Sequence, residues 1–248
     1  MADQYWNEEV AARYDATSAE VFDDAVLGPT VDLLAELADG GRALELAVGT
    51  GRVALPLSGR GIEVSGIELS QPMADQLRAK PGGERIKITI GDMATTRIDG
   101  TFQLVYLVYN TITNLLTQGE QVDCFSNASA HLDPGGHFLI EVFVPSLQRL
   151  PVGERFVPFD VGGGHIGVDE YDIVNQRLTS HHFWVDDGRG YSLDSPHRYA
   201  WPAEYDLMAR LAGMTLTHRW ANWNRDPFTS ESTSHLSVWT KTPHRTQS

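Results

Sequence analysis

The middle of the chain alternates short, almost entirely apolar runs with segments whose apolar residues recur every three or four positions. The first pattern is typical of strands buried on both faces, and the second is typical of amphipathic helices. The apolar runs predict strands at residues 43–48, 63–67, 85–90, 102–108 and 137–144. Strands that alternate with helices in this way indicate an α/β protein with a parallel sheet.

The helices expected between these strands begin at recognisable capping residues. They are predicted at residues 31–39, 51–60, 72–80 and 117–131. Thr30 and Ser70 can cap the first and third, and Thr117 forms a capping box with Glu120 at the start of the fourth. Pro56 lies inside the second helix, so we expect a kink or a short first turn there.

The pattern changes after Pro145. Residues 150–200 contain glycine-rich turns and stretches of alternating polar and apolar positions, which predict antiparallel strands. A helical pattern returns at residues 201–211, and two further strands are expected at 215–220 and 235–240.

The charge of the chain is strongly negative. Its 248 residues suit one α/β domain with an appendage or at most two small domains, and its formal net charge is −14. Ten acidic residues against one arginine give the first forty positions a charge of −9. Such a surface repels phosphate backbones and anionic lipids, so neither nucleic acid nor a membrane is an expected partner.

Cysteine content and apolar runs indicate the compartment. The single cysteine, Cys124, excludes internal disulfides and a cysteine-rich zinc site, and we expect it to be a buried thiol. The acidic N-terminal segment lacks the apolar core of a signal peptide, and no apolar run reaches the roughly 20 residues of a membrane span. We therefore expect a soluble, cytoplasmic protein without a metal site.

Glycines follow the first predicted strand, in the stretch Glu45-Leu-Ala-Val-Gly-Thr-Gly51. Glycine there lets the backbone approach a ligand closely, and the start of the next helix offers free N–H groups. Glu68 follows the second strand, where a carboxylate can accept hydrogen bonds from ribose hydroxyls. Because the glycines also fit the G-x-G-x-x-A fingerprint, these features alone leave open a nicotinamide dinucleotide, a nucleoside-type cofactor, or a turn without a ligand.

The end of the third strand narrows this choice. Asp92, in the stretch Gly-Asp-Met, can accept a hydrogen bond from an adenine amino group, and Met93 can pack on the ring. The carboxyl ends of adjacent parallel strands meet at one edge of the sheet, so these residues and Glu68 would surround one adenosine.

In order and spacing, these motifs resemble the class I S-adenosylmethionine-dependent methyltransferases. The resemblance rests on ELAVGTG, IELS, GDM, YLVYNTITNL and HLDPGGHFLIE, and covers about residues 30–145. It implies a Rossmann-like seven-stranded sheet with helices on both faces, closed by a reversed hairpin near the C-terminus, plus a small antiparallel β insert that covers the active site. The chain departs from the common family form at Ala47, where glycine is usual, and at Gln103, where an acid is usual.

The resemblance also implies a division of the chain. Residues 1–29 would form an N-terminal segment with a helix that covers the cofactor. Residues 30–148 and 201–242 would form the S-adenosylmethionine-binding domain, and residues 149–200 the antiparallel insert on the substrate side.

By the same resemblance, S-adenosylmethionine is the expected cofactor and S-adenosylhomocysteine its product. Glu68 would hold the ribose, Asp92 the adenine, and Val108 would face the sulfonium. The full set of residues expected at the cofactor is Tyr5, Tyr14, Glu45, Ala47, Gly49, Gly51, Glu68, Leu69, Met73, Asp92, Met93 and Val108.

The N-terminal segment and the insert are similar to those of amino-sugar N,N-dimethyltransferases and lincosamide N-methyltransferases. In the former group a tyrosine matching Tyr14 closes over the cofactor, and an aromatic face also suits a sulfonium. That group carries a histidine near the methyl, but this chain has Asn114, which can orient an acceptor and cannot act as a base. The residues expected to position the acceptor are Tyr14, Tyr109, Asn110 and Asn114.

We therefore predict in-line methyl transfer to a small molecule, with an amine nitrogen of a secondary metabolite or amino sugar favoured. The alternatives are a small-molecule O-methyltransferase and a non-catalytic nucleoside-binding protein. A nicotinamide-dependent oxidoreductase would leave Asp92 unexplained. A base, if one is used, would come from His181 or His182, which point to opposite faces of their strand. The acceptor, the number of methyl groups transferred and any homo-oligomer are left open.

Overall fold

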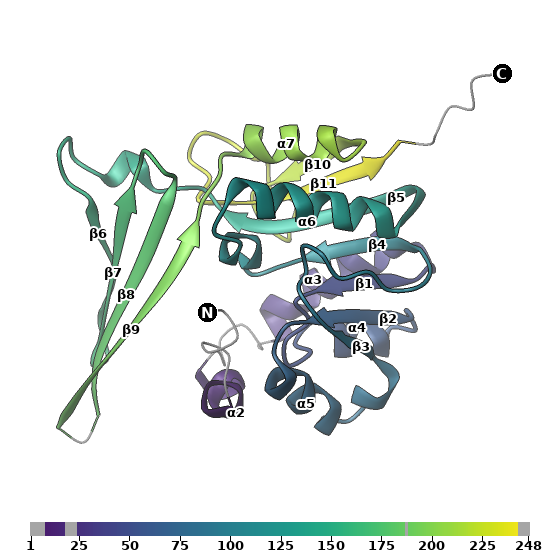
Figure 1. Ribbon diagram of the computed structural model, residues 1–248, viewed down its shortest axis with the longest axis horizontal. Helices are drawn as coiled ribbons and strands as arrows, with labels where there is room; N and C mark the ends of the chain where they lie inside the picture. The colour runs from purple at the N-terminus through teal and green to yellow at the C-terminus, as the bar shows by residue number, and fades with distance from the viewer. Residues whose placement is uncertain (1–7, 18–23, 187, 243–248) are drawn as a thin grey trace.

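Two β-sheets organise the computed structural model, which describes residues 8–17, 24–186 and 188–242 (Figure 1). The larger sheet has seven strands in the order β10-β11-β5-β4-β1-β2-β3. In chain order these are β1 (Ala43–Leu46), β2 (Val64–Glu68), β3 (Lys87–Ile90), β4 (Phe102–Leu107), β5 (Leu132–Phe143), β10 (Met214–Trp220) and β11 (Ser234–Lys241). Strand β11 is antiparallel to both of its neighbours, β5 and β10, and the other strand pairs of this sheet are parallel. This confirms the Rossmann-like sheet with its reversed final hairpin.

Helices cover both faces of this sheet. They are α3 (Asp24–Ala38), α4 (Ala54–Gly59), α5 (Gln71–Ala79), α6 (Gln118–His131) and α7 (Pro202–Leu211). Under α6 and α7, aromatic side chains fill the core: the ring of Phe125 lies 5.0 Å from Phe138 and 5.2 Å from Trp239, centroid to centroid. A second buried cluster joins α3 and α4 to the opposite face. The expected helical layers are thus confirmed.

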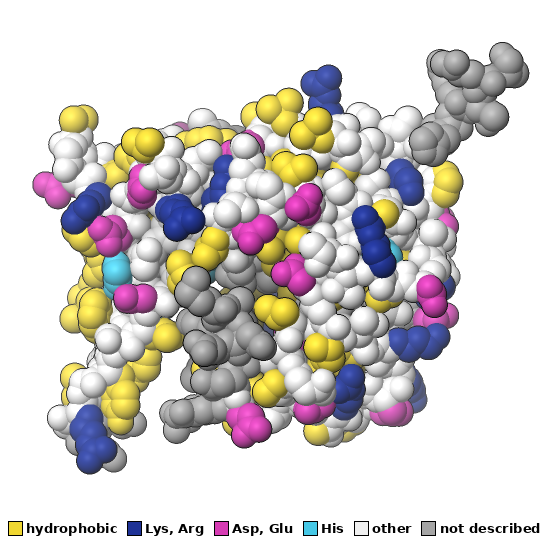
Figure 2. Space-filling view, in the orientation of Figure 1, with side chains coloured by type: hydrophobic (Ala, Val, Ile, Leu, Met, Phe, Trp, Pro, Cys, Tyr) yellow, Lys and Arg dark blue, Asp and Glu magenta, His cyan; other side chains and the backbone are white. Residues whose placement is uncertain are grey.

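The second sheet stands beside the first and has four antiparallel strands (Figure 1). These are β6 (Phe156–Gly162), β7 (His165–Asp172), β8 (Arg177–Asp186) and β9 (Arg189–Arg198). They confirm the antiparallel character expected for residues 150–200. Hydrophobic side chains lie exposed along this sheet (Figure 2), among them Phe156, Val161, Ile166, Phe183 and Val185.

Short helical segments connect the main elements. Helix α2 (Glu8–Thr17) packs against α5, and Figure 1 shows it between α5 and the four-stranded sheet. The remaining segments are the 3-10 turns η2 (Gly83–Arg85), η3 (Thr111–Asn114) and η4 (Leu147–Arg149).

Two of the three predicted helix caps are confirmed, and one is wrong. The Ser70 side chain caps α5, and Thr117 forms the expected capping box with Glu120. Thr30 does not cap a helix, because α3 begins at Asp24 and passes through Pro29. Proline removes one backbone N–H but its φ angle is helical, so burial of the helix face outweighs the lost hydrogen bond. The helix expected at residues 51–60 begins only at Ala54, so Pro56 lies in the first turn of the short α4.

Two expectations about burial and membranes can also be compared with the structure. Cys124 is buried in α6, and burial raises the pKa of its thiol. Within the described ranges, no helix is long and apolar enough to cross a membrane.

Candidate functional site

The turn between β1 and α4 adopts backbone conformations that few side chains tolerate. Ala47, Gly49 and Gly51 have positive φ angles of 55°, 57° and 82°. A Cβ atom on Gly51 would lie 2.7 Å from Cγ of Leu77 in α5, so glycine is required there. At Gly49 the nearest atom to such a Cβ is Cε of Met73, at 3.9 Å. The turn is therefore tightly packed at Gly51 and open at Gly49, where a ligand can approach the backbone.

Glu68 joins the end of β2 to this turn. Its Oε2 accepts a hydrogen bond from the backbone N–H of Gly49, and its Oε1 accepts one from the N–H of Ser70, each at 2.8 Å. Glu68 is only 6% exposed, and burial raises its pKa. Each carboxylate oxygen retains a second lone pair. Glu68 can therefore hold the turn in place and also accept hydrogen bonds from ligand hydroxyl groups.

The end of β3 supplies a second carboxylate at the same edge of the sheet. Asp92 is exposed, and its Oδ1 accepts a hydrogen bond from the N–H of Ala94 at 2.7 Å. Its other oxygen has room for a ligand donor. Met93 and Leu69 are half-buried beside β3 and β2, and Met73 is buried below the turn. This edge thus offers apolar surface and an acceptor together, which suits an adenine ring.

Glu45 lies under the turn, in the fully buried strand β1. Its Oε2 accepts a hydrogen bond from the phenol of Tyr106 at 2.9 Å. Burial raises the pKa of Glu45 to about 8, although the Tyr106 hydrogen bond and the charge of Arg52 oppose the shift. A nearby cation would favour its ionised form. Glu45 therefore suits a ligand that carries a positive charge.

Helix α2 is fastened to the glycine-rich turn by an ion pair and two hydrogen bonds. Oδ1 of Asp15 accepts a hydrogen bond from the hydroxyl of Thr50 at 2.6 Å. Lys80 at the end of α5 forms an ion pair with Asp15 and donates to the carbonyl of Thr50 at 2.7 Å. The next residue back from Asp15, Tyr14, is thereby held over the turn.

Tyr14 and Tyr109 approach each other above the turn. The pKa of the Tyr14 phenol is raised to about 12, mainly by burial and next by the neighbouring Tyr109. The guanidinium of Arg52 lies 5.2 Å from the centre of the Tyr109 ring. The structure thus brings together Tyr14 from α2, Tyr109 from the loop after β4 and the glycine-rich turn after β1.

The loop after β4 is held in an unusual conformation. Tyr109 and Asn110 both have left-handed backbones, with φ angles of 58° and 61°. The backbone N–H of Tyr109 donates to Oε2 of Glu141 at 2.9 Å, and Oε1 of Glu141 accepts from the indole of Trp223 at 2.7 Å. The Oδ1 of Asn110 accepts from the N–H of Phe143 at 2.7 Å. The amide oxygen of Asn110 therefore anchors the loop. Within the described part of the chain its NH₂ group has no hydrogen-bond partner, so that group can contact an acceptor.

Turn η3 connects this loop to the four-stranded sheet. Its last residue, Asn114, is half-buried, and the hydroxyl of the preceding Thr113 lies 3.1 Å from Nδ1 of His197 in β9. Nε2 of His197 lies 3.0 Å from the hydroxyl of Ser195. The pKa of His197 is lowered to about 4, mainly by burial and next by nearby His182, so this imidazole is neutral at pH 7.

The face of the four-stranded sheet that carries His197 is turned toward η3, and we call it the inner face. Strand pairing and alternation place these residues of β7, β8 and β9 on it: His165, Gly167, Asp169, Tyr171, Leu178, Ser180, His182, Trp184, Tyr191, Leu193, Ser195 and His197. His181 lies on the opposite face, which confirms that the two adjacent histidines diverge.

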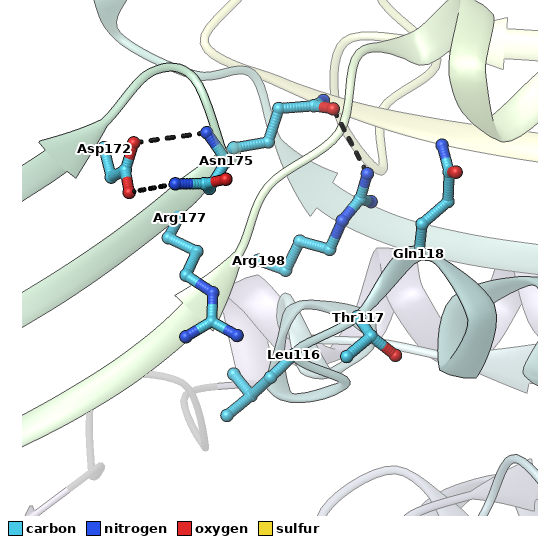
Figure 3. Close-up of a pocket in the computed structure, with 8 residues that line it drawn as sticks. Leu116, Thr117, Gln118, Asp172, Asn175, Arg177 and Arg198 are labelled. Carbon is cyan, nitrogen blue, oxygen red and sulfur yellow. Dashed lines mark hydrogen bonds between the residues drawn. The ribbon is translucent and has the colours of Figure 1, made fainter.

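A separate polar hollow lies where this sheet meets α6 (Figure 3). It is lined by Leu116, Thr117, Gln118, Asp172, Asn175, Gln176, Arg177 and Arg198. Arg198 donates to Oε1 of Gln121 in α6 and to Oε1 of Glu204 in α7, each at 2.6 Å. None of the residues expected at the cofactor or the acceptor lines this hollow. It is the joint between the four-stranded sheet and the rest of the chain.

The structure gathers most of the predicted site at one edge of the large sheet. Tyr5 lies outside the described residues, and Val108 is buried at the end of β4. Sequence reasoning missed Asp15, Lys80 and Glu141, which hold the site through long-range contacts. Throughout the described ranges, no group of three or more His, Cys, Asp or Glu side chains is placed to hold a metal ion.

Comparison with known proteins gives a consistent result. Residues 43–136 match a family profile described as a methyltransferase domain. The structure of the CcbJ methyltransferase from Streptomyces caelestis is 36% identical to this chain, covers 86% of it and 88% of its own length, and has a TM-score of 0.78. The cypemycin N-terminal methyltransferase of a Streptomyces species is 28% identical over 91% of this chain and 96% of its own. DesVI of Streptomyces venezuelae, at 20% identity, shares the fold with a TM-score of 0.68, over 94% of this chain and 98% of its own.

Proposed function

Because this chain belongs to the S-adenosylmethionine-dependent methyltransferases, we propose that it methylates an amine nitrogen of a small molecule, such as a secondary metabolite or an amino sugar. The cofactor supplies a methyl group bound to a sulfonium sulfur. The residues around the glycine-rich turn fit this group. With the cofactor bound, Glu68 would accept hydrogen bonds from the ribose hydroxyls, Asp92 would accept one from the adenine amino group, and the buried Glu45 would lie near the ammonium of the methionine part.

The side chains on the inner face of the four-stranded sheet favour an amine as the methyl acceptor. Asp169 accepts a hydrogen bond from the Ser180 hydroxyl at 2.7 Å, and His182 lies on the same face. Among the described residues, the inner-face positions of β7 and β8 hold no lysine or arginine. A carboxylate and an imidazole at these positions suit a hydrogen-bond donor such as an amine or an ammonium. The name of the cypemycin N-terminal methyltransferase supports an amine as well, since it specifies a chain-terminal nitrogen.

Methyl transfer requires mainly that the acceptor and the methyl group be held in line. The lone pair of a neutral amine forms the new N–C bond on the side opposite sulfur, while the C–S electron pair returns to sulfur. Tyr14 and Tyr109 enclose the reacting groups, and Asn110 and Asn114 orient the acceptor. Holding two reactants in line supplies about 7–11 kcal/mol of the barrier at best. A partly apolar enclosure also favours the neutral amine over the ammonium.

Transfer of labelled methyl groups tests the proposal. We would compare an amino sugar and a dipeptide with free amines, their N-acetyl derivatives, and the corresponding hydroxyl compounds. Label on the free amines alone is the expected result. Label on the hydroxyl compounds alone would replace the proposal with O-methylation. Thermal unfolding should show stabilisation by S-adenosylhomocysteine and none by NADH, and an S-adenosylhomocysteine response without any acceptor would favour a non-catalytic nucleoside-binding protein.

Tyr14→Phe separates chemistry from binding. The ring, which packs over the turn, is kept, so the dissociation constant of S-adenosylhomocysteine should stay within about twofold. Loss of the hydroxyl should lower turnover about tenfold, equivalent to about 1.4 kcal/mol. Unchanged turnover would make Tyr14 a packing residue only.

A further inference from the structure

Three side chains form a hydrogen-bonded row across β6, β7 and β8. Nδ1 of His165 lies 2.5 Å from Oδ2 of Asp160, and Nε2 of His165 lies 3.0 Å from Nδ1 of His182. The two imidazole rings are nearly stacked, with centroids 5.2 Å apart and planes at 25°. Phe159 packs edge-on against His182 at 5.4 Å. The row is therefore supported on one side by an aromatic ring.

The carboxylate at the start of the row fixes the tautomers. An ionised Asp160 can only accept, so Nδ1 of His165 carries the hydrogen. Nε2 of a neutral His165 is then an acceptor, and Nδ1 of His182 must be the donor. Nε2 of His182 consequently keeps a lone pair, and no hydrogen-bond partner for it is found among the described residues. The row thus ends in a free proton-accepting nitrogen.

His182 belongs to the inner face, which meets the site through His197. That residue contacts Thr113, the neighbour of the acceptor candidate Asn114. Helix α2, which carries Tyr14, stands between this sheet and α5 (Figure 1). His182 is half-buried, so its ring is partly shielded from water and still reachable by a ligand. The free nitrogen is therefore on the side of the sheet where an acceptor would lie.

We propose that His182 is the catalytic residue that takes the proton released by the methylated amine, and that His165 and Asp160 position it. This inference rests on the proposed N-methylation. As the N–C bond forms in the rate-limiting step, the nitrogen becomes a cation. Its N–H bond breaks, the electron pair stays on nitrogen, and the proton passes to Nε2 of His182. The imidazolium so formed donates through Nδ1 to His165, which is hydrogen-bonded to Asp160.

The charges around His182 set the pH range in which it works. Burial lowers its pKa, and His165 on β7 and His181 on its own strand lower it too. Asp160 on β6 and Asp194 on β9 act in the opposite direction. Since the pKa lies below the ordinary value of about 6.5, the imidazole is neutral at pH 7 and ready to accept a proton.

His181 provides a matched control. It has the same side chain one position away, on the opposite face, where Nδ1 lies 2.8 Å from Oδ1 of Asp194 and Nε2 lies 3.1 Å from Oε2 of Glu170. The hydrogen bond to Asp194 raises its pKa. Its two nitrogens are occupied, so it has no lone pair to offer.

Kinetics with the amine acceptor found in the labelling experiment test the proposal. His182→Gln should lower kcat about 10²-fold, at the lower end of the range for general acid–base catalysis, and leave the dissociation constant of S-adenosylhomocysteine within about twofold. His181→Gln should leave both values within about twofold. The wild-type kcat should fall toward acid with a midpoint below the ordinary histidine value of about 6.5, and His182→Gln should lose that dependence. Wild-type kcat in His182→Gln, with cofactor affinity intact, would overturn the inference and leave N-methylation standing.

The positioning residues need a readout besides activity. Nitrogen NMR of labelled histidines in the full chain should show Nδ1 of His182 protonated and Nε2 unprotonated. Asp160→Asn should change this tautomer balance and shift the kcat–pH profile, whereas Asp160→Glu should restore both. The opposite tautomer of His182 in the wild type, or an unchanged one in Asp160→Asn, would overturn the row as drawn. Because this measurement needs no acceptor, it still decides the matter if none of the amines takes label.

Discussion

The cofactor edge of the seven-stranded sheet and the inner face of the four-stranded sheet are built on different principles. At the cofactor edge, the working parts are backbone: left-handed turns at Gly49 and Gly51, and N–H groups bonded to Glu68. On the inner face, the working parts are side chains, such as His182 and Asp169, on a regular antiparallel scaffold. The first arrangement leaves a strong local sequence signature. The second leaves almost none.

Burial follows the same division. The central strands β1 and β2 are buried at every position, whereas the described positions of β6 are exposed at all but one. The four-stranded sheet has a small core of its own, formed by Val157, Tyr171, Leu178 and Tyr199. We infer that the large sheet provides most of the stability and fixes a common cofactor, and that the smaller sheet is free to vary with the acceptor.

The largest expected effect comes from breaking the joint between the two regions. Arg198 is 4% exposed and binds Glu204 and Gln121, so Arg198→Met leaves the half-buried carboxylate of Glu204 without its cation, with only the amides of Gln118 and Gln176 as partners. Removing one member of a buried ion pair costs about 3–5 kcal/mol, measurable as a loss of unfolding free energy in urea. Methyl transfer should fall much more than affinity for S-adenosylhomocysteine, since the glycine-rich turn is untouched. Arg177→Met, in the same hollow and exposed, should change stability by less than about 0.5 kcal/mol. Equal effects of both variants would show that Arg198 is not the joint.

The second effect is confined to the cofactor edge. Glu68→Ala leaves the N–H groups of Gly49 and Ser70 without their charged acceptor and removes the ribose contact. Hydrogen bonds to charged groups contribute about 1.5–3 kcal/mol each, so the dissociation constant of S-adenosylhomocysteine should rise about 100-fold, measured by calorimetry. The exposed Asp92, changed to alanine, should cost about tenfold. Affinity unchanged in both variants would contradict the cofactor assignment.

Features formed by residues close together in the chain could be predicted from the sequence, with one exception. The Thr117–Glu120 capping box and the glycine-rich turn lie within a few residues and were predicted correctly. Thr30 failed as a cap because tertiary burial carried the helix back through Pro29.

Contacts between residues that are far apart in the chain could not be predicted from the sequence. The Asp15–Lys80 pair joins residues 65 positions apart in the chain, and the row from Asp160 through His165 to His182 forms only when β6, β7 and β8 pair. Each of these side chains is ordinary for a solvated surface, so nothing in its local pattern distinguishes it. Such contacts become visible only when the strand register is known.

The third prediction concerns one histidine in each region whose pKa is lowered by burial. Burial lowers the pKa of His235 in β11 to about 3 and that of His197 in β9 to about 4. In the unfolded chain both have a pKa of about 6.5, so the unfolded state alone binds protons as the pH falls below that value. The stabilising contribution of these two histidines should therefore be complete at neutral pH and decline toward acid, with a loss of about 2 kcal/mol each near pH 5. Glu45, whose pKa is raised to about 8, acts in the opposite direction, because its protonation favours the folded state as the pH falls.

Unfolding free energies measured at neutral pH and near pH 5 test this prediction. Relative to the unchanged chain, His235→Gln and His197→Gln should each lose about 2 kcal/mol less between neutral pH and about pH 5, because glutamine does not titrate. An equally steep loss in both variants would place its origin in other groups. A flatter profile in His235→Gln alone would mean that His197 is reached by water in the smaller, less buried sheet, which would sharpen the contrast between the two regions.

The smallest effect concerns two neighbouring positions of the glycine-rich turn. Ala47 has a φ angle of 55°, a conformation that costs a residue with a Cβ about 1 kcal/mol or more. Ala47→Gly should relieve this strain and, after the greater freedom of glycine in the unfolded chain is subtracted, raise stability by about 0.5 kcal/mol. The reciprocal change, Gly49→Ala, introduces the same strain at a φ of 57° and should lower stability by about 1 kcal/mol. It should also weaken S-adenosylhomocysteine binding, since the new methyl group occupies the open side of the turn. Thermal unfolding with and without ligand measures both quantities. Stabilisation by Gly49→Ala, or a loss in Ala47→Gly, would show that side-chain packing and not backbone conformation governs this turn, and the distinction between the two regions would no longer hold.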